Sequence, residues 1–383
     1  MKDIVTLLAA AEQLRASGDE GGVGGGGAGV LVTLVHTSGS TYRRPGARML
    51  VLPGCRTVGT ISGGCLEPAV AKEAWERTRA ESRVCFSCES APEDDTWGPA
   101  SGCHGILYLL AERLGPAERH PALELLRLVR ATHRPALVAH YFDNRSAGEL
   151  KPVGGQHDSR WQGEEQVTLA NATSRWVEHD GVAAFLECLQ PPTHLLICGA
   201  GDDAQPLERI AAELAWSVDV IDTRGRLATR ERFARADHVI ADSPERVATL
   251  VHPHTAAVLM SHRFADDLEF LGQLLGAGGG GTSPAYIGLL GPRRRADRLL
   301  EELARRDIRP TARQSAALRS PVGLDLGSNS PETIALAVVA EIQAALAQRD
   351  ARPLSNRVGP IHGPLESRPA MQASARRAGE CAI

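Results

Sequence analysis

The amino-acid sequence lacks the features of membrane-spanning and exported proteins. No apolar run approaches the ~18 residues that a membrane-spanning helix requires. Residues 1–8 contain one basic residue, Lys2, and their apolar stretch soon meets Glu12, so we expect no secretory signal. Eight cysteines in 383 residues are too few for a disulfide scaffold. We therefore expect reduced thiols in a cytoplasmic protein.

Lysine is scarce, and a large excess of either charge is missing. Lys2, Lys72 and Lys151 are the only lysines, so 39 of the 42 basic residues are arginine, a bias that by itself singles out no site. The net charge of −4 argues against a protein that coats nucleic acid. The 43% hydrophobic content is ordinary for a globular protein, and the length suits two or three domains.

The first half of the chain is predicted to be mixed α and β. Residues 21–29 contain seven glycines, which we interpret as a flexible loop, because a phosphate-binding loop would end in Gly-Lys-Ser/Thr. Apolar spacing predicts helices over 3–16, 66–80 and 122–130, and strands over 30–35, 47–52, 57–61, 84–88, 105–111 and 136–141.

A regular alternation of strands and helices begins after Pro191-Pro192. Strands are predicted over 194–198, 217–221, 238–240, 256–260 and 286–290, and helices over 204–214, 230–234, 266–275, 293–305 and 331–347. This alternation is typical of a doubly wound parallel sheet. We therefore expect an α/β protein with a mixed α+β domain over 1–190, a doubly wound domain over 191–347 and a disordered tail over 348–383.

A glycine fingerprint follows the first strand of the second domain. Gly199, Gly201 and Ala204 fit the G-x-G-x-x-G/A pattern, and Asp222 ends the next strand, where a ribose-binding acid would lie. The pattern predicts a Rossmann-like domain and leaves its ligand open, with a nucleotide as one candidate. Asp202 and Asp203 suit the helix dipole but would repel a pyrophosphate. The fingerprint supports an NAD(P)-dependent oxidoreductase as an alternative hypothesis, whereas the two acids argue against it.

Polar segments follow each predicted strand of this domain, and a doubly wound sheet brings them to one edge. Gly291-Pro-Arg293-Arg-Arg opens a helix and is interpreted either as an anion site or as a solvated helix start. His262 has two interpretations: it forms an acid–base or metal pair with Asp266 or Asp267, or it is an ordinary surface histidine. Arg224, two residues after Asp222, lies at the same edge.

Cysteines occur in two kinds of place. Cys85 and Cys88 form a C-x-x-C on a predicted strand, which favours coincidental thiols over a zinc site or a redox pair. Cys65 instead lies where a strand turns into a helix, and the helix dipole there makes a thiol a better nucleophile or soft ligand. Cys103 also has glycine neighbours, which let a ligand approach the backbone.

Several ordered blocks resemble the XdhC/CoxI family. Residues 39–50, GSTYRRPGARML, and 58–67, VGTISGGCLE, resemble its N-terminal signature. The second half is similar in Asp222-x-Arg224, Met260-Ser-His262, Asp267, 286–291 and 321–327. The resemblance covers about residues 30–346, although Asp202-Asp203 stand where the family often has His-Val.

The resemblance implies an accessory protein of xanthine dehydrogenase and related molybdenum hydroxylases, rather than an enzyme with its own turnover. Such proteins bind molybdenum cofactor, protect it while a terminal sulfur is added, and help to insert it into the apo-hydroxylase. The implied partners are that hydroxylase, a cysteine desulfurase and a second copy of the chain, with no nucleic acid. Cys65 is the expected molybdenum contact. The other expected cofactor-binding residues are Arg43, Arg48, Gly63, Gly64, Glu67, Cys103, Gly199, Gly201, Asp222, Arg224, His262, Gly291 and Arg293.

Overall fold

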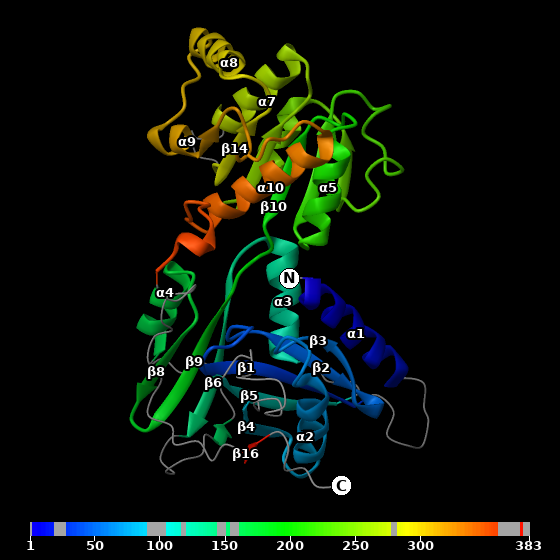
Figure 1. The fold of residues 1–383 in the computed structure, drawn as a ribbon, viewed down its shortest axis with the longest axis vertical. Coiled ribbons are helices and arrows are strands. Elements are labelled where there is room, and N and C mark those ends of the chain that lie inside the picture. The colour runs from blue at the N-terminus through cyan, green and yellow to red at the C-terminus, as the bar shows by residue number, and fades with distance from the viewer. Residues whose placement is uncertain are drawn as a thin grey trace. The chain divides into compact units, whose positions relative to one another are not determined.

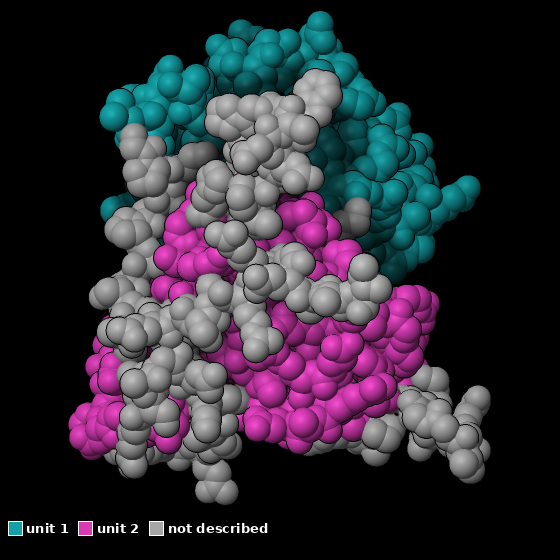
Figure 2. Space-filling model, turned by 60° about the horizontal axis from the view of Figure 1, so that its bottom comes forward, with its two compact units in different colours: residues 1, 191–362 teal, residues 2–190, 363–383 magenta. Residues whose placement is uncertain are grey.

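Three β-sheets organise the chain in the computed structural model (Figure 1). The structure describes residues 2–18, 28–89, 105–115, 120–143, 151–153, 161–276, 282–358 and 376–377. Two compact units emerge, coloured separately in Figure 2. One contains residues 2–190 and 363–383, here the N-terminal unit, and the other contains residues 1 and 191–362, here the C-terminal unit.

The N-terminal unit contains a six-stranded sheet in the order β16-β4-β5-β1-β2-β3. Its strands are β1 (Gly29–Gly39), β2 (Arg48–Leu52), β3 (Arg56–Gly59), β4 (Arg83–Glu89), β5 (Gly105–Leu114) and β16 (Arg376–Arg377). Side chains alternate across the sheet, so Val30 and Val32 pack with α2 (Glu67–Ala80), whereas Leu31 packs with α1 (Lys2–Gly18) and α3 (Pro121–Thr132). The helix α2 also contacts β3, and the turn between them contains the exposed thiol of Cys65.

A four-stranded antiparallel sheet completes this unit, in the order β7-β6-β9-β8. It consists of β6 (Ala136–Asp143), β7 (Lys151–Val153), β8 (Arg175–His179) and β9 (Val182–Leu189), with α4 (Gln162–Ala170) against it. The Trp176 indole N–H donates to the Val35 carbonyl at 3.1 Å, which ties the two sheets together. The sequence interpretation missed β8 and β9, although the Asp180-Gly181 pair between them is a hairpin signal, with φ of 51° and 75°.

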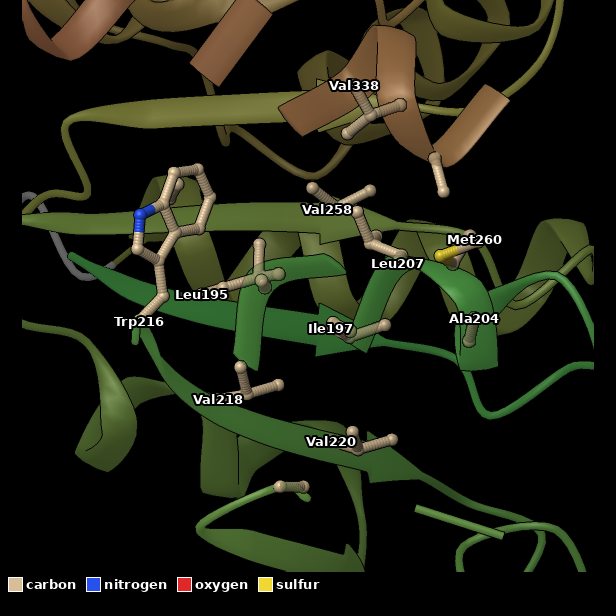
Figure 3. Packing of buried hydrophobic residues seen from close by; sticks show 14 of the residues in the cluster. Leu195, Ile197, Ala204, Leu207, Trp216, Val218, Val220, Val258, Met260 and Val338 are labelled. Atoms are coloured by element: carbon tan, nitrogen blue, oxygen red, sulfur yellow. The ribbon is translucent and has the colours of Figure 1, made fainter. Parts of the chain in front are cut away.

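The C-terminal unit is a doubly wound parallel sheet, as expected. Its order is β12-β11-β10-β13-β14-β15, from β10 (His194–Cys198), β11 (Ser217–Asp222), β12 (His238–Ala241), β13 (Thr255–Leu259), β14 (Tyr286–Leu289) and β15 (Leu318–Arg319). On one face, Leu195 and Ile197 pack with Leu207 of α5 (Ala204–Glu213) and Val338 of α10 (Pro331–Leu346), as Figure 3 shows. The other face packs with α6 (Val247–Leu250), α7 (Phe264–Gly276) and α8 (Arg293–Arg305), and α9 (Ala312–Ala317) precedes β15.

One predicted helix is wrong. Residues 230–234 form turns, because the Arg232 guanidinium donates to the carbonyls of Leu227 and Ala200, both at 3.2 Å, and Phe233 is fully buried as an anchor. The start of α10 is confirmed, since the Ser330 hydroxyl accepts from the Thr333 N–H at 3.3 Å.

Three sequence features fall wholly or partly outside the described residues: residues 21–27 of the glycine-rich loop, Cys103, and residues 359–375 and 378–383 of the expected tail. Among the described helices, none combines the length and apolar character needed to cross a membrane.

Candidate functional site

An exposed thiol, Cys65, lies in the turn between β3 and α2. The turn is built around Glu67, whose carboxylate accepts from the N–H groups of Ile61 and Ser62 at 3.1 and 2.9 Å and from the Ser62 hydroxyl at 2.5 Å. The Ser62 oxygen in turn accepts from the N–H groups of Gly64 and Leu66, both at 3.3 Å. We call residues 61–67 the thiol turn.

Glu67 holds the thiol turn and is itself buried, with 5% of its surface exposed. Burial raises the pKa of its carboxyl, but the bonds from Ser62 and from the backbone outweigh this and leave the pKa below its usual value. Glu67 therefore acts as an ionised anchor inside the protein, whereas Cys65 is exposed on the same turn. The Cys65 sulfur lies 3.9 Å from the Ser62 oxygen.

The two glycines before Cys65 leave the backbone uncovered. Gly64 has a φ of +110°, which L side chains rarely adopt, and no atom lies within 4 Å of where its Cβ would be. At Gly63 a Cβ would lie 3.9 Å from Cγ of Tyr42. A ligand can therefore approach the main chain beside the thiol.

Arg48 was expected to bind cofactor, but the structure places it in the interior. Its guanidinium makes a bidentate ion pair with Glu187 of β9, at 2.7 and 2.5 Å, and both side chains are at most 4% exposed. His140 Nε2 lies 3.4 Å from the same carboxylate. Burial raises the pKa of Glu187, yet the Arg48 charge and the His140 bond bring it down to about 2.

The Arg48–Glu187 pair fixes the segment between β1 and β2 to the second sheet. Arg43 lies half-buried in this segment, where the Thr41 hydroxyl donates to its carbonyl at 3.1 Å. The sequence analysis did not identify Glu187, which lies 139 residues from Arg48. The signal available was an acid inside an apolar strand, since a buried charge requires a partner.

The C-x-x-C pair does not bring its two thiols together. Cys85 and Cys88 lie on β4 and belong to different core clusters, so their thiols do not converge. Burial, with the nearby charges of Glu73, Cys65 and Glu89, raises the pKa of Cys88 to about 11. Across the described ranges, no group of three or more His, Cys, Asp or Glu side chains is arranged to hold a metal.

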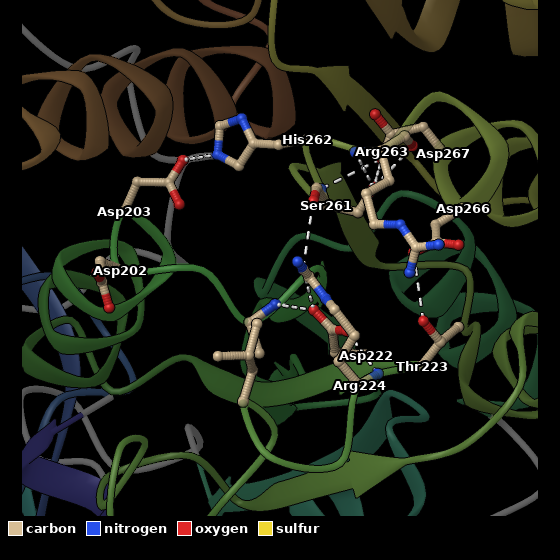
Figure 4. A network of polar contacts seen from close by, with 12 residues as sticks. Asp202, Asp203, Asp222, Thr223, Arg224, Ser261, His262, Arg263, Asp266 and Asp267 are labelled. Atoms are coloured by element: carbon tan, nitrogen blue, oxygen red, sulfur yellow. Dashed lines mark hydrogen bonds and ion pairs between the residues drawn. The ribbon is translucent and has the colours of Figure 1, made fainter.

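A second group of expected residues meets at the carboxyl edge of the parallel sheet (Figure 4). The strand order reverses between β10 and β13, which is where ligands bind in doubly wound folds. Gly199 has a φ of +124°, and a Cβ there would lie 2.6 Å from the Met260 carbonyl and the Ser261 nitrogen. A side chain at Gly199, the first glycine of the fingerprint, would therefore clash with the loop that contains Met260 and Ser261.

Asp222 is directed at the protein itself. Its carboxylate, 1% exposed, accepts from the Ala200 N–H at 2.7 Å and from the backbone N–H and guanidinium of Arg224 at 2.8 Å. Burial raises its pKa, but the Arg224 bonds and the Ala200 N–H lower it overall. Arg224 also donates to the Ser261 carbonyl at 3.2 Å. The Asp222 carboxylate therefore has its hydrogen-bonding positions filled by the protein, mainly by Arg224.

Of the two interpretations of His262, the pairing with Asp266 or Asp267 is replaced by a pairing with Asp203, and the side chain is exposed, as an ordinary surface histidine would be. His262 Nε2 lies 2.7 Å from Oδ2 of Asp203, across the switch point, as Figure 4 shows. Asp267 instead accepts from the Ser261 hydroxyl and from Arg295, at 2.5 and 2.7 Å. The sequence interpretation overlooked Asp203 because the contact joins loops that are 59 residues apart. His262 also has a φ of +61°, a strained conformation for a residue with a side chain.

The start of α8 carries the arginine run. Arg293 and Arg294 are exposed, whereas Arg295 is paired with Asp267. Gly291 has a φ of +116°, and a Cβ there would lie 3.0 Å from Cδ of Arg295. The first turn of α8 has no acidic residue and no side-chain cap, and the helix begins with three arginines.

Comparisons with known proteins match both regions. Residues 23–87 match the model of the XdhC and CoxI family, and residues 195–342 match the XdhC Rossmann domain. A Bacillus subtilis (strain 168) protein, named as a probable subunit of xanthine dehydrogenase, is 31% identical over 319 residues, which cover 82% of this chain and 92% of the relative. The chain belongs to the XdhC/CoxI family.

Two further relatives agree with this assignment. The XdhC/CoxI chain is 27% identical over 315 residues to "Molybdenum cofactor insertion chaperone PaoD" of Escherichia coli (strain K12), covering 82% of each protein. A crystal structure from Bacillus halodurans, described as a xanthine dehydrogenase, superposes with a TM-score of 0.67 at 27% identity, covering 91% of this chain and 98% of that chain. The family resemblance and the Rossmann-like fold expected from the sequence are confirmed.

The matched segments coincide with the two regions described above. The XdhC and CoxI model covers the thiol turn and the segment that contains Arg43 and Arg48. The XdhC Rossmann domain covers every expected residue at the carboxyl edge, from Gly199 to Arg293. Cys103 lies outside both matched segments.

Proposed function

We propose that this XdhC/CoxI protein is a carrier that binds molybdenum cofactor at the thiol turn and delivers it to an apo molybdenum hydroxylase. The observation that carries the proposal is the exposed Cys65 thiol on a turn that Glu67 holds rigid. The name of the Escherichia coli relative supports the same function. A thiolate is a soft ligand and therefore suits a sulfur-ligated metal centre.

Each residue of the thiol turn has a separate task in this proposal. Cys65 contacts or guards the metal. Gly63 and Gly64 allow the cofactor to reach the main chain, since neither carries a Cβ that would cover it. Glu67 keeps the turn in one conformation. Arg43, on the neighbouring segment, contributes positive charge toward the cofactor phosphate.

The proposal extends to sulfuration of the cofactor, to the oligomeric state and to the cellular location. The carrier keeps the cofactor from solvent while a cysteine desulfurase supplies the terminal sulfur, acts as a homodimer, and works in the cytoplasm. Cys103 serves as a second thiol for the cofactor. These steps are supported by the family resemblance, the low cysteine content and the two glycine-flanked cysteines of the sequence.

The proposed ligand of the parallel sheet is a phosphate group or a nucleotide extension of the cofactor, held by Arg293 and the first N–H groups of α8. A nicotinamide dinucleotide in the usual pose is disfavoured by two contacts. Asp222 is saturated by Ala200 and Arg224, so it has no free oxygen for a ribose. Asp203 and His262 meet across the switch point.

Retention of the cofactor tests the proposal. The protein is purified from a host that makes molybdenum cofactor, and molybdenum content and fluorescence of the oxidised pterin are measured after gel filtration. Wild type should retain both near stoichiometry, and Cys65→Ala should lose most of both. Cys55→Ala is the matched control, because Cys55 is also an exposed thiol of the same unit. A folded wild type without cofactor, or equal loss in both variants, would contradict the proposal.

A further inference from the structure

Tyr42 is an aromatic side chain exposed to solvent in a protein with few aromatics. Phe, Trp and Tyr make up 4% of the sequence. Among the aromatic residues that the structure describes, Tyr42 alone is exposed, with 72% of its surface accessible. A large ring left in water is informative, because most rings contribute to a core.

The Tyr42 ring lies beside the thiol turn. A Cβ on Gly63 would be 3.9 Å from Cγ of Tyr42, which is ordinary van der Waals contact, so the ring stands next to the uncovered main chain of the two glycines. Cys65 follows two residues after Gly63 and is exposed. The ring therefore lies beside Gly63, two residues before the exposed thiol.

The main chain on either side of Tyr42 is held in place. A Cβ on Gly105 would lie 2.4 Å from the Ser40 carbonyl, so β5 supports the segment closely before Tyr42. The Thr41 hydroxyl donates across Tyr42 to the Arg43 carbonyl, and after Tyr42 the Arg48 guanidinium anchors the segment to Glu187. A ring on a fixed segment loses little conformational freedom when a ligand binds.

We propose that Tyr42 is a positioning residue that stacks on the pterin ring of the cofactor, with the dithiolene and metal end directed toward Cys65. This inference rests on the proposed function. A pterin is a flat heteroaromatic ring, and such rings stack favourably on aromatic side chains. The glycine pair lets the ring system lie against the protein between the two side chains. Tyr42 thus recognises the organic part of the cofactor, and Cys65 the metal part.

A protein partner is the other class of ligand that an exposed tyrosine serves, because tyrosine is enriched in interfaces. An interface core needs several apolar side chains together. Within described residues 39–67, Tyr42 is the sole large apolar side chain that is exposed. The ring lies against Gly63, whose lack of a side chain leaves room for a small flat ligand.

Metal-free molybdopterin and the molybdenum-loaded cofactor separate the two contacts. Both are titrated into wild type, Tyr42→Phe, Tyr42→Leu and Cys65→Ala, and binding is followed by quenching and hypochromism of the pterin. Tyr42→Leu should weaken both forms about tenfold, because it keeps an apolar side chain but removes the ring. Tyr42→Phe should stay within about twofold of wild type. Cys65→Ala should weaken only the metal-loaded form.

The outcomes are distinguishable. If wild type binds both forms and Tyr42→Leu binds them equally well, the stacking inference is overturned while the proposed function stands. The same holds if Tyr42→Leu keeps its affinity but fails to deliver cofactor, which would assign Tyr42 to a protein partner. If wild type binds neither form, both proposals fail together. Thermal unfolding within about 2 °C of wild type confirms that the exposed substitution leaves the fold intact.

Discussion

Ser62 and Glu67 are joined twice, through a 2.5 Å bond from the Ser62 hydroxyl and a 2.9 Å bond from its N–H to the same carboxylate. The Ser62 oxygen also accepts from Gly64 and Leu66, so this pair determines the shape of the turn that displays Cys65. The buried carboxylate of Glu67 is thus stabilised by N–H and O–H donors of its own turn.

Glu67→Gln should destabilise the N-terminal unit by about 1–3 kcal/mol. The substitution replaces one carboxylate oxygen, which accepts hydrogen bonds from the turn, with an NH₂ group that would face the N–H and O–H donors of that turn. Burial raises the folded-state pKa of Glu67, but the hydrogen bonds from Ser62 and the backbone outweigh it and leave the pKa below its ordinary value of 4.5. Its contribution is therefore present above about pH 4.5 and is lost as pH falls through the folded-state pKa. Urea unfolding of wild type and variant from pH 7 downward measures this. A difference that grows in acid would contradict the assignment.

The buried pair of Arg48 and Glu187 should respond asymmetrically to substitution. Glu187→Leu leaves a buried guanidinium unpaired and should cost about 3–5 kcal/mol. Replacing both residues together, with Arg48→Met and Glu187→Leu, should recover much of this loss, because no buried charge remains at the pair. A double-mutant cycle in urea tests the coupling. Additive losses would show that the two side chains do not stabilise each other.

Two glycines with open space around them should behave oppositely. Gly64→Ala should destabilise by about 1–3 kcal/mol, because its φ of +110° strains any residue with a Cβ. Gly163→Ala, in α4, should stabilise by about 0.5 kcal/mol, since helical glycine costs backbone entropy. Thermal unfolding of both variants gives the signs. Stabilisation by Gly64→Ala would exclude the turn conformation described.

The C-terminal unit should show no binding of NADH or NADPH at nucleotide concentrations up to about 1 mM. The carboxylate of Asp222 already accepts hydrogen bonds from Arg224, and two further acids lie at the start of α5. Nucleotide fluorescence and calorimetry on the wild-type chain test this. Asp222→Ala should destabilise the unit rather than change nucleotide binding. Tight NADH binding that Asp222→Ala abolishes would restore the oxidoreductase hypothesis.

The layout of the fold was accessible from the sequence where the signals are local. The strands and helices after Pro191 follow apolar periodicity, and the capping box of Ser330 and Thr333 marks the start of α10. The failures are contacts between distant segments. Periodicity cannot report that Glu187 pairs with Arg48, or that Asp203 rather than Asp266 meets His262. The missed β8–β9 hairpin differs, since Asp180-Gly181 was a local signal that was not used.

Delivery of cofactor to an apo-hydroxylase distinguishes a carrier from a protein that only binds cofactor. An apo molybdenum hydroxylase is incubated with cofactor-loaded wild-type chain, with loaded Cys55→Ala and with material from Cys65→Ala, and hydroxylase activity is measured. Wild type and Cys55→Ala should restore activity to the same extent, and Cys65→Ala should restore little. Equal activation by Cys65→Ala, or no advantage of loaded carrier over free cofactor, would contradict the account.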